Sequence, residues 1–538
     1  MAAGTFRVKT SCSRLPYASG AGATITISSS HPWKGDIVVL DYFVMAAYLI
    51  GILGVGYWGM RRSKSKSDYL VAGRRLGGFM YSGAMSAIVL GGASTVGGIG
   101  LGWEYGISGA WLVTAIGLGI LLLSAFLAKR IVKLKVYTVT EMLDLRYGGD
   151  NGLISGIVMF LYTMMLTVTS TLAYATIFHV LFGISNVWGV VIGGTIVAIY
   201  SIMGGMWSIT MTDIVQFVIK TVGMFLLLLP IALSQALGDT GGWDGMRERL
   251  GDAFFSPWSI GGLTIVTYII VYTLGLLIGQ DIWQRVVTAK NARVAKWGGL
   301  SSGVYCLLYA LAGALIGMAA RVLFPDMENR NDAFAFMAQE MLPPGIRGIV
   351  LAAALSAMMS TASGALIASA TVFSTDIMPW VKRLFGVKPK AVEMHDGHVA
   401  GDNLWPYRIT VFALSAITMF IATLVTDVVA ALTIAYNILV GGLLIAIIGG
   451  LFWKRGTRAG ALASMAVGTV VVVVSMLLMG MFANEPIYFS LAASLVTYVI
   501  VSLVTKPTES GVLDEWNKRL SLDDRTAVNE VVYEVVKH

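Results

Sequence analysis

Charged side chains are scarce in this chain of 538 residues, and their scarcity excludes most classes of protein. Asp, Glu, Lys and Arg together make up 13% of the residues, whereas hydrophobic residues make up 56%. In an ordinary soluble protein about 25% of the residues are charged. The composition therefore excludes a soluble globular protein and predicts that much of the chain lies in lipid.

Cysteine is nearly absent as well. Cys12 and Cys306 lie far apart in the sequence, so they predict neither a disulfide framework nor a cysteine-ligated metal site. A Walker loop, a dinucleotide-binding fingerprint and a nucleophile elbow are also missing. We therefore expect no ATP hydrolysis, no other enzymatic activity and no cofactor.

Long apolar runs are what the chain has in abundance. They are long enough to cross a bilayer as helices, which takes about 20 residues each, and they predict an all-α polytopic membrane protein. We expect thirteen spans, at 38–60, 79–105, 109–130, 152–182, 186–203, 210–236, 259–280, 298–323, 348–375, 408–427, 428–453, 459–482 and 486–505. The two spans that meet at Asp427 have almost no loop between them, so a single kinked element remains an alternative there.

The basic residues predict the orientation of these spans. Of the 38 Lys and Arg residues, 28 fall in one set of alternate loops and in the C-terminal tail. By the positive-inside rule, those loops and the C-terminus are cytoplasmic and the N-terminus lies outside, as an odd number of spans requires. This distribution also explains the net charge of +8 without a nucleic-acid partner.

The predicted organisation has three parts, with the protein placed in the cell membrane as a multi-pass protein. Residues 1–37 form a polar extension outside, 38–505 form the transmembrane domain with its core at 79–453, and 506–538 form a cytoplasmic tail. The extension is compatible with a transit peptide, a disordered tail or an over-called translation start. The tail is short, which disfavours a sensory protein with an attached kinase module.

Two spans are interrupted by glycines at places that correspond in two halves of the chain. The second span carries six glycines between Gly91 and Gly102, and the seventh begins IGGLTIVTYIIVYTLGLLIGQ. Such segments indicate broken helices whose freed backbone groups line a site near the middle of the membrane. They lie five spans apart, as the first helices of two five-helix repeats would. The alternative is that these glycines permit close helix packing.

The ninth span places oxygen atoms on one face of a helix. Ala357, Ser360 and Thr361 follow one another at helical spacing, so they lie on the same side. A monovalent cation accepts neutral oxygen ligands, so this face suits a sodium ion. The alternative is that the hydroxyls only bond back to carbonyls of their own helix and pack against a neighbour.

Two charged residues accompany the sixth span. Asp213 is expected at its cytoplasmic mouth, either as a helix N-cap or as a waystation for a departing cation. Lys220 is expected to extend its ammonium group back to the interface, with anion binding as the alternative. We expect no buried carboxylate or histidine chain in the spans, which disfavours proton coupling.

Several motifs, in order, resemble the sodium:solute symporter family, which includes bacterial proline, pantothenate and acetate carriers and the sodium–glucose transporters. The resemblance covers residues 40 to 505 and rests on DYLVAGRRLGG (Asp68–Gly78), GGIGLGWEYGISG (Gly97–Gly109), YTVTEMLDLRYG (Tyr137–Gly148), GGMWSITMTDIVQ (Gly204–Gln216), GQDIWQRVVTAKNARVAKWG (Gly279–Gly298), ALSAMMSTASG (Ala354–Gly364) and GLFWKRGTRAGA (Gly450–Ala461).

The resemblance implies a leucine-transporter-type core of two inverted five-helix repeats, spans two to six and seven to eleven. It implies a sodium site made by the carbonyls of Ala87, Leu90 and Ala357 and the hydroxyls of Ser360 and Thr361. For the solute, the candidate residues are Ser94, Thr95, Tyr268, Tyr272, Tyr436 and Asn437. The chain departs from the proline-carrier pattern at Val89, where an aspartate is expected, and at Ala93, where a tryptophan is expected, and both departures disfavour proline.

The function that follows is secondary active transport. Sodium entering down its gradient drives the uptake of a small organic solute by alternating access. The partners are therefore sodium, a small solute and the lipid bilayer. A proton-coupled carrier of the same fold and a membrane sensory domain are the alternatives.

Overall fold

The computed structural model describes residues 39–149, 152–386, 394–395, 398–399, 404–425, 427–480 and 483–521. The predicted extension 1–37 and the tail beyond residue 521 lie outside these ranges. Helices form nearly all of the described chain, and the two strands, β1 (Met394–His395) and β2 (His398–Val399), form one short antiparallel pair.

Apolar helices long enough to cross a membrane dominate the described residues. There are eleven such segments, and a bent pair raises the number to twelve. They contain α1 (Val39–Met60), α4 (Gly98–Tyr105), α5 (Trp111–Leu122), α6 (Ala128–Leu134), α8 (Gly152–Phe182), α9 (Asn186–Gly204), α10 (Met206–Thr221), α11 (Leu229–Thr240), α16 (Ala292–Leu323), α18 (Ile346–Val372), α19 (Met378–Leu384), α20 (Trp405–Ala422), α21 (Val428–Phe452), α22 (Arg458–Met479) and α23 (Glu485–Val504). The bent pair is α13 (Gly262–Tyr268) to α14 (Leu274–Leu276), followed by α15 (Gln280–Val286).

The count differs from the thirteen expected spans at one place. Residues 93–134 form one uninterrupted apolar stretch, whereas the sequence predicts the end of one span and a second span there, and α4 and α5 are indeed separate helices within it. Within this segment Gly106 has a φ of 65°, and Gly109 lies directly against the backbone of Leu101 and Gly102. The chain therefore folds back on itself at this point, where a side chain on Gly109 would clash.

The alternative of a single kinked element at Asp427 is wrong. Helices α20 and α21 are separate, and the side chain of Asp427 caps α21 by accepting a hydrogen bond from the amide of Ala430 at 2.6 Å. A carboxylate in this position satisfies an amide that has no partner within its own helix, so it begins a new helix.

The expected break in the second span is confirmed. Helix α3 (Gly78–Val89) ends at Leu90, whose backbone is not helical, and the chain resumes with a π-helical turn, η2 (Ala93–Gly97), before α4. The expected break in the seventh span is confirmed too, because the chain bends by 47° between α14 and α15. Both breaks leave backbone carbonyls and amides outside regular helical bonding.

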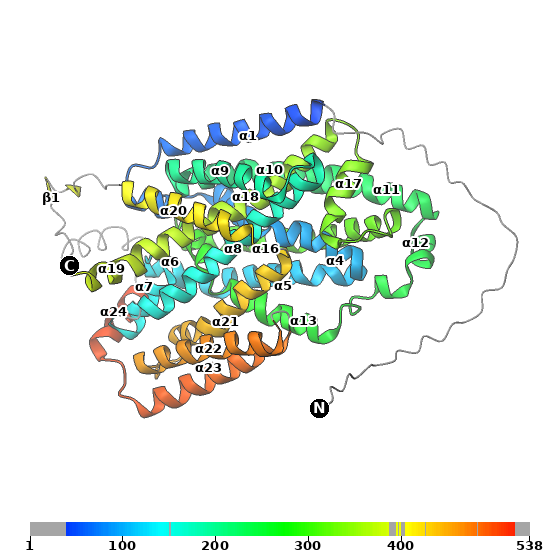
Figure 1. Ribbon diagram of the computed structural model, residues 1–538. Helices are drawn as coiled ribbons and strands as arrows, with labels where there is room; N and C mark the ends of the chain where they lie inside the picture. The colour runs from blue at the N-terminus through cyan, green and yellow to red at the C-terminus, as the bar shows by residue number, and fades with distance from the viewer. Residues whose placement is uncertain are drawn as a thin grey trace, which may run out of the picture.

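The most buried helix of the bundle lies against both broken spans, at α3 and at α15. Helix α18 is buried along nearly its whole length and packs against α3, α8 and α10. Figure 1 shows α1 along one side of the bundle and α22 with α23 along the other. Small residues such as Ala353, Ala357 and Gly364 on α18 allow its neighbours to approach closely.

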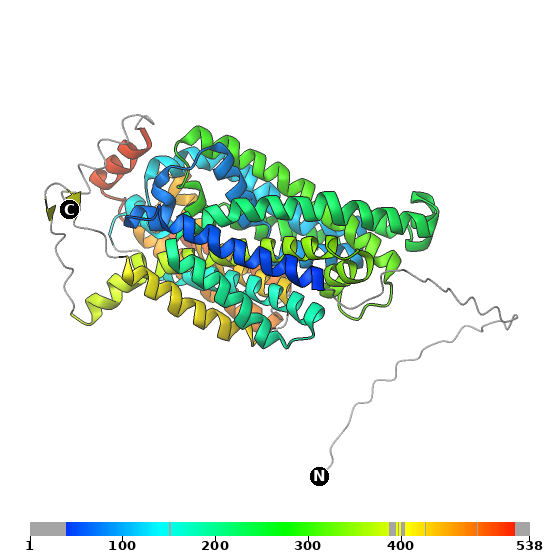
Figure 2. The same ribbon diagram turned by 90° about the horizontal axis from the view of Figure 1, so that it is seen from above.

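Short helices mark the two ends of the bundle. Helices α7 (Val139–Tyr147) and α24 (Ser510–Ser521) lie at one end with α6 and α19, and α12 (Trp243–Leu250) lies at the other (Figure 1). In Figure 2 the red helix α24 projects at the end opposite to that where α1 begins. Two further short helices are α2 (Lys66–Val71) and α17 (Ala333–Met341).

Candidate cation and solute site

The oxygen-bearing face of α18 meets the broken end of α3. The Ser360 hydroxyl donates to the carbonyl oxygens of Ala87 and Ala357, both at 2.9 Å. The Thr361 hydroxyl donates to the carbonyl of Ile88 at 2.6 Å. Since α3 stops at Val89, the carbonyls of Ala87 and Ile88 lie at the end of a helix, where no intrahelical partner is available.

Glycine at position 91 permits this close approach. A Cβ atom built on Gly91 would lie 2.5 Å from the Thr361 Oγ1 atom, a distance that no real side chain tolerates. The backbone at the break after α3 therefore packs directly against α18.

Lys220 lies deep in the same cluster, so its expected extension to the interface is wrong. Its side chain is 1% exposed, and its ammonium group donates to the carbonyls of Ser86 at 3.1 Å, Ala87 at 3.3 Å and Leu90 at 3.4 Å. The five expected sodium ligands thus lie together, and an ammonium nitrogen touches two of them.

Asp213 lies within α10 and not at its start, so the expected N-cap role is wrong. The helix begins at Met206, and Gly205 precedes it without a side-chain cap. The buried carboxylate of Asp213 instead pairs with the buried guanidinium of Arg285 on α15, at 2.6 Å. This ion pair links the sixth span to the second half of the broken seventh span.

Asp281 is a second buried acid, so the expectation of spans without a buried carboxylate is also wrong. It lies in the first turn of α15, just after the break, is 3% exposed, and accepts a hydrogen bond from the Tyr162 hydroxyl at 3.0 Å. The first turn of a helix favours a carboxylate because unpaired amides point toward it.

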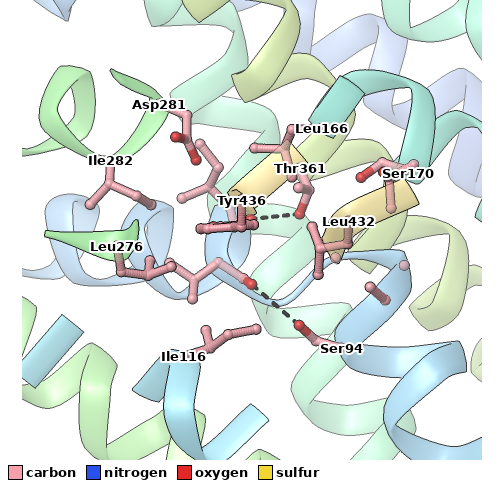
Figure 3. A pocket seen from close by; sticks show the side chains of 16 residues that line it. Ser94, Ile116, Leu166, Ser170, Leu276, Asp281, Ile282, Thr361, Leu432 and Tyr436 are labelled. Atoms are coloured by element: carbon pink, nitrogen blue, oxygen red, sulfur yellow. Dashed lines mark hydrogen bonds between the residues drawn. The ribbon is translucent and has the colours of Figure 1, made fainter. Parts of the chain in front are cut away.

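A small cavity lies between the two breaks, and Asp281 lines it together with Thr361 (Figure 3). It measures about 20 Å³, which is enough for roughly one water molecule. Its lining is otherwise mostly apolar and consists of Ile88, Val89, Gly91, Gly92, Ala93, Ser94, Ile116, Leu166, Thr169, Ser170, Leu276, Ile282, Leu432 and Tyr436.

The six expected solute residues separate into three groups. Ser94 and Tyr436 line the small cavity. Tyr268 and Tyr272 line a larger pocket of about 390 Å³, together with Arg330 and Asp427. The side chains of Thr95 and Asn437 contact other helices, at Tyr309 and Met476 respectively.

A stack of rings lies between this larger pocket and the small cavity. The ring centroids of Tyr272 and Tyr436 are 5.3 Å apart, and Tyr436 also meets Tyr162 edge-on at 5.2 Å. The Tyr272 hydroxyl is within 2.9 Å of the Thr433 hydroxyl. Tyr272 lines the larger pocket and Tyr436 lines the small cavity, so these two rings in contact lie between the two spaces.

Sequence reasoning missed Asp281 and misjudged Lys220. Asp281 lies two residues after Gly279, and a charged residue so close to a glycine that ends an apolar run was the available signal. Lys220 lies roughly 10 Å along the helix from Asp213, so its depth in the span could be predicted from the sequence. Its carbonyl partners could not be predicted, because only the fold brings α10 against the end of α3.

Known proteins share this sequence and this architecture. A family model described as the sodium:solute symporter family matches residues 69–468. Sodium/proline symporter 2 of Staphylococcus saprophyticus is 26% identical over 90% of this chain and 96% of its own length. The sodium/proline symporter of Staphylococcus aureus strain JH9 is 25% identical over the same shares.

Two solved structures share the fold. A Na⁺-coupled sialic acid symporter in a substrate-bound outward-open state superposes with a TM-score of 0.73 at 19% identity, over 88% of this chain and 100% of that chain. The nucleobase-cation-symport transporter Mhp1 in a closed conformation gives a TM-score of 0.55 at 14% identity, over 85% and 99%.

Proposed function

The chain belongs to the sodium:solute symporter family and is a sodium-coupled symporter with the leucine-transporter-type fold, and from this premise we propose that it imports a small solute bearing a protonated amine. The observation that carries the proposal is the Asp281 carboxylate in the otherwise mostly apolar cavity between the two broken helices. The Asp281 carboxylate is the counter-charge for the amine.

The chemistry of the cavity supports this class of solute. A buried carboxylate is stable only with hydrogen-bond donors or a positive partner, and the ammonium group of a solute supplies both. The apolar side chains of Val89, Leu276 and Leu432 favour a hydrocarbon body beside that group. The Tyr436 and Ser94 hydroxyls remain proposed solute contacts.

Proline is the first solute to test. It carries a protonated secondary amine on an apolar ring, and both staphylococcal relatives are named for it. Val89 and Ala93, which disfavour proline by comparison with the family pattern, both line the cavity. If these two residues exclude proline, they do so by changing the shape of the cavity. Other small amines and amino acids are therefore the solutes to test after proline.

Sodium supplies enough free energy for accumulation. One ion crossing 100 mV contributes about 2.3 kcal/mol, and each tenfold sodium gradient adds about 1.4 kcal/mol. One sodium ion per solute therefore sustains a solute gradient on the order of 10²–10³-fold.

The path and the orientation belong to the same proposal. The pocket with Tyr268 and Arg330 is the outer entrance, and the ring of Tyr272 closes it above the cavity.

Basic residues gather at the opposite end, where Lys129, Arg130, Lys133, Arg146 and Lys454 line a pocket beside α24. By the positive-inside rule that end is cytoplasmic, the N-terminus lies outside, and the membrane is the cell membrane. Asp213 remains a proposed station for the departing ion.

The test is solute uptake by the full chain in proteoliposomes, with Asp281→Asn as the variant. We expect the half-saturating concentration of an amine solute to rise at least tenfold in Asp281→Asn, because the amide keeps the shape and loses the charge. Asp281→Glu keeps the charge and is the matched control. Equal half-saturation of the folded Asn variant and the native chain contradicts the amine assignment.

A further inference from the structure

We propose that the ammonium group of Lys220 and the coupling sodium ion occupy the same carbonyl cluster in turn, so that Lys220 is a tethered competitor of sodium. The inference rests on the proposed function, since it concerns the sodium site of that symporter. It goes further because Lys220 is not one of the five sodium ligands that the family resemblance implies, and the inference gives this lysine a role.

The first observation is the coordination of the Lys220 nitrogen. Its three partners are the carbonyls of Ser86, Ala87 and Leu90, at 3.1 to 3.4 Å, all at the broken end of α3. Neutral carbonyls at a helix C-terminus attract a cation, because the helix dipole leaves them partly negative. The Lys220 ammonium and a sodium ion present the same unit charge to these oxygens.

The second observation is the overlap with the expected sodium ligands. Ala87 and Leu90 are two of the five, and the Ala87 carbonyl accepts hydrogen bonds from both Lys220 and Ser360. A sodium ion held by these oxygens would lie within a few ångströms of the ammonium group. Two unit charges so close repel strongly where the surroundings are buried and poorly screened.

The third observation is that Lys220 has no acid as a direct partner among the described residues. The nearby carboxylate of Asp213 on the same helix is paired with Arg285 at 2.6 Å. From α16, the Tyr309 ring faces the Lys220 nitrogen, which lies 5.8 Å from its centroid. The carbonyl cluster is therefore the site that holds this buried charge, and removal of the charge leaves the cluster with no cation of its own.

A direct measurement of sodium binding separates this role from a structural one. We compare the purified native chain with Lys220→Met, which keeps an unbranched side chain and removes the charge. Lys296→Met is the matched control, because Lys296 lies near the start of α16, is exposed and contacts the ring of its neighbour Trp297. Sodium affinity is read from thermal stabilisation as sodium replaces choline, and from binding of radioactive sodium.

We expect Lys220→Met to lower the half-saturating sodium concentration at least tenfold, with no change in Lys296→Met. Lys220→Arg keeps a cation at the site and should not improve sodium binding. Lys220→Gln is the second neutral variant, for use if the methionine variant does not fold. A folded neutral variant that binds sodium no more tightly than the native chain overturns the inference.

The outcome is distinguishable from failure of the proposed function. If uptake by the native chain and by Lys220→Met depends equally on sodium at equal affinity, the symporter assignment stands and the inference fails. If uptake by the native chain ignores sodium while Lys220→Met requires it, the lysine never leaves the cluster, and both the alternation of the two cations and sodium coupling of the native chain fail.

Discussion

At the scale of single residues, the hydroxyl of Thr361 decides between packing and ion binding. It donates to the Ile88 carbonyl at 2.6 Å and lies against Gly91, where α3 breaks. Both roles use the same atom, so the position of Thr361 alone does not separate them.

Two substitutions at Thr361 do separate them. Thr361→Val keeps the branched shape and removes the oxygen, whereas Thr361→Ser keeps the oxygen and removes a methyl group. If the hydroxyl is a sodium ligand, the valine variant loses about 2–3 kcal/mol of sodium-binding free energy. This loss raises its half-saturating sodium concentration roughly 30- to 150-fold. The serine variant should lose only about 1 kcal/mol of stability through a small cavity.

The measurement is sodium-dependent uptake in vesicles, normalised to folded protein, and Ser360→Ala should change it in the same direction as Thr361→Val. The reverse order, with valine tolerated at unchanged sodium dependence and serine impaired, assigns Thr361 to packing and removes it from the ligand set.

At the scale of helices, the pair Asp213–Arg285 ties α10 to α15. Both side chains are almost wholly buried, so removing one partner leaves the other as an uncompensated charge. Asp213→Asn is therefore expected to destabilise the protein by about 3–5 kcal/mol. The double variant Asp213→Asn with Arg285→Gln removes both charges and should recover much of the loss.

Thermal unfolding in detergent measures how much the Asp213–Arg285 ion pair contributes to stability. Sodium efflux from loaded vesicles tests the proposed ion-exit role of Asp213. If the single and double variants unfold at the same temperature as the native chain, the ion pair does not contribute to stability. A folded Asp213→Asn variant with normal sodium efflux shows that Asp213 is no waystation.

The helices themselves were largely predictable from the sequence, for a physical reason. An apolar run of about 20 residues has no stable alternative to a helix in lipid, so twelve of the thirteen expected spans coincide with helices found by length and apolarity. The expected spans 79–105 and 109–130 run together as one apolar stretch because no long polar loop separates them, although the chain turns back between them at Gly106. Asp427, by contrast, gave a sharp signal, since a lone carboxylate before an apolar run is a typical N-cap.

The site was predictable only in part. The face formed by Ala357, Ser360 and Thr361 follows from helical periodicity, and the glycines of the second span indicate its break. The partners of Lys220, Asp213 and Arg285 do not follow, because they lie on helices distant in the sequence. A buried charge in a span is stable only through such partners, so local reasoning placed Lys220 at the interface and Asp213 at a helix start.

At the scale of the whole molecule, the two broken helices and α18 enclose a cavity of about 20 Å³, too small for an organic solute. A larger pocket lies beyond the rings of Tyr272 and Tyr436. Transport through the proposed site at the breaks therefore requires the bundle to open around it, first toward one side of the membrane and then toward the other. This is the alternating access expected for inverted repeats.

The most direct test of the central claim is concentrative uptake by the full chain in proteoliposomes. With an inward sodium gradient, we predict that proline or another small amine accumulates above its external concentration, and that replacing sodium by choline abolishes this accumulation. Equal uptake in sodium and choline, driven by a pH gradient alone, would contradict sodium-coupled transport by this protein.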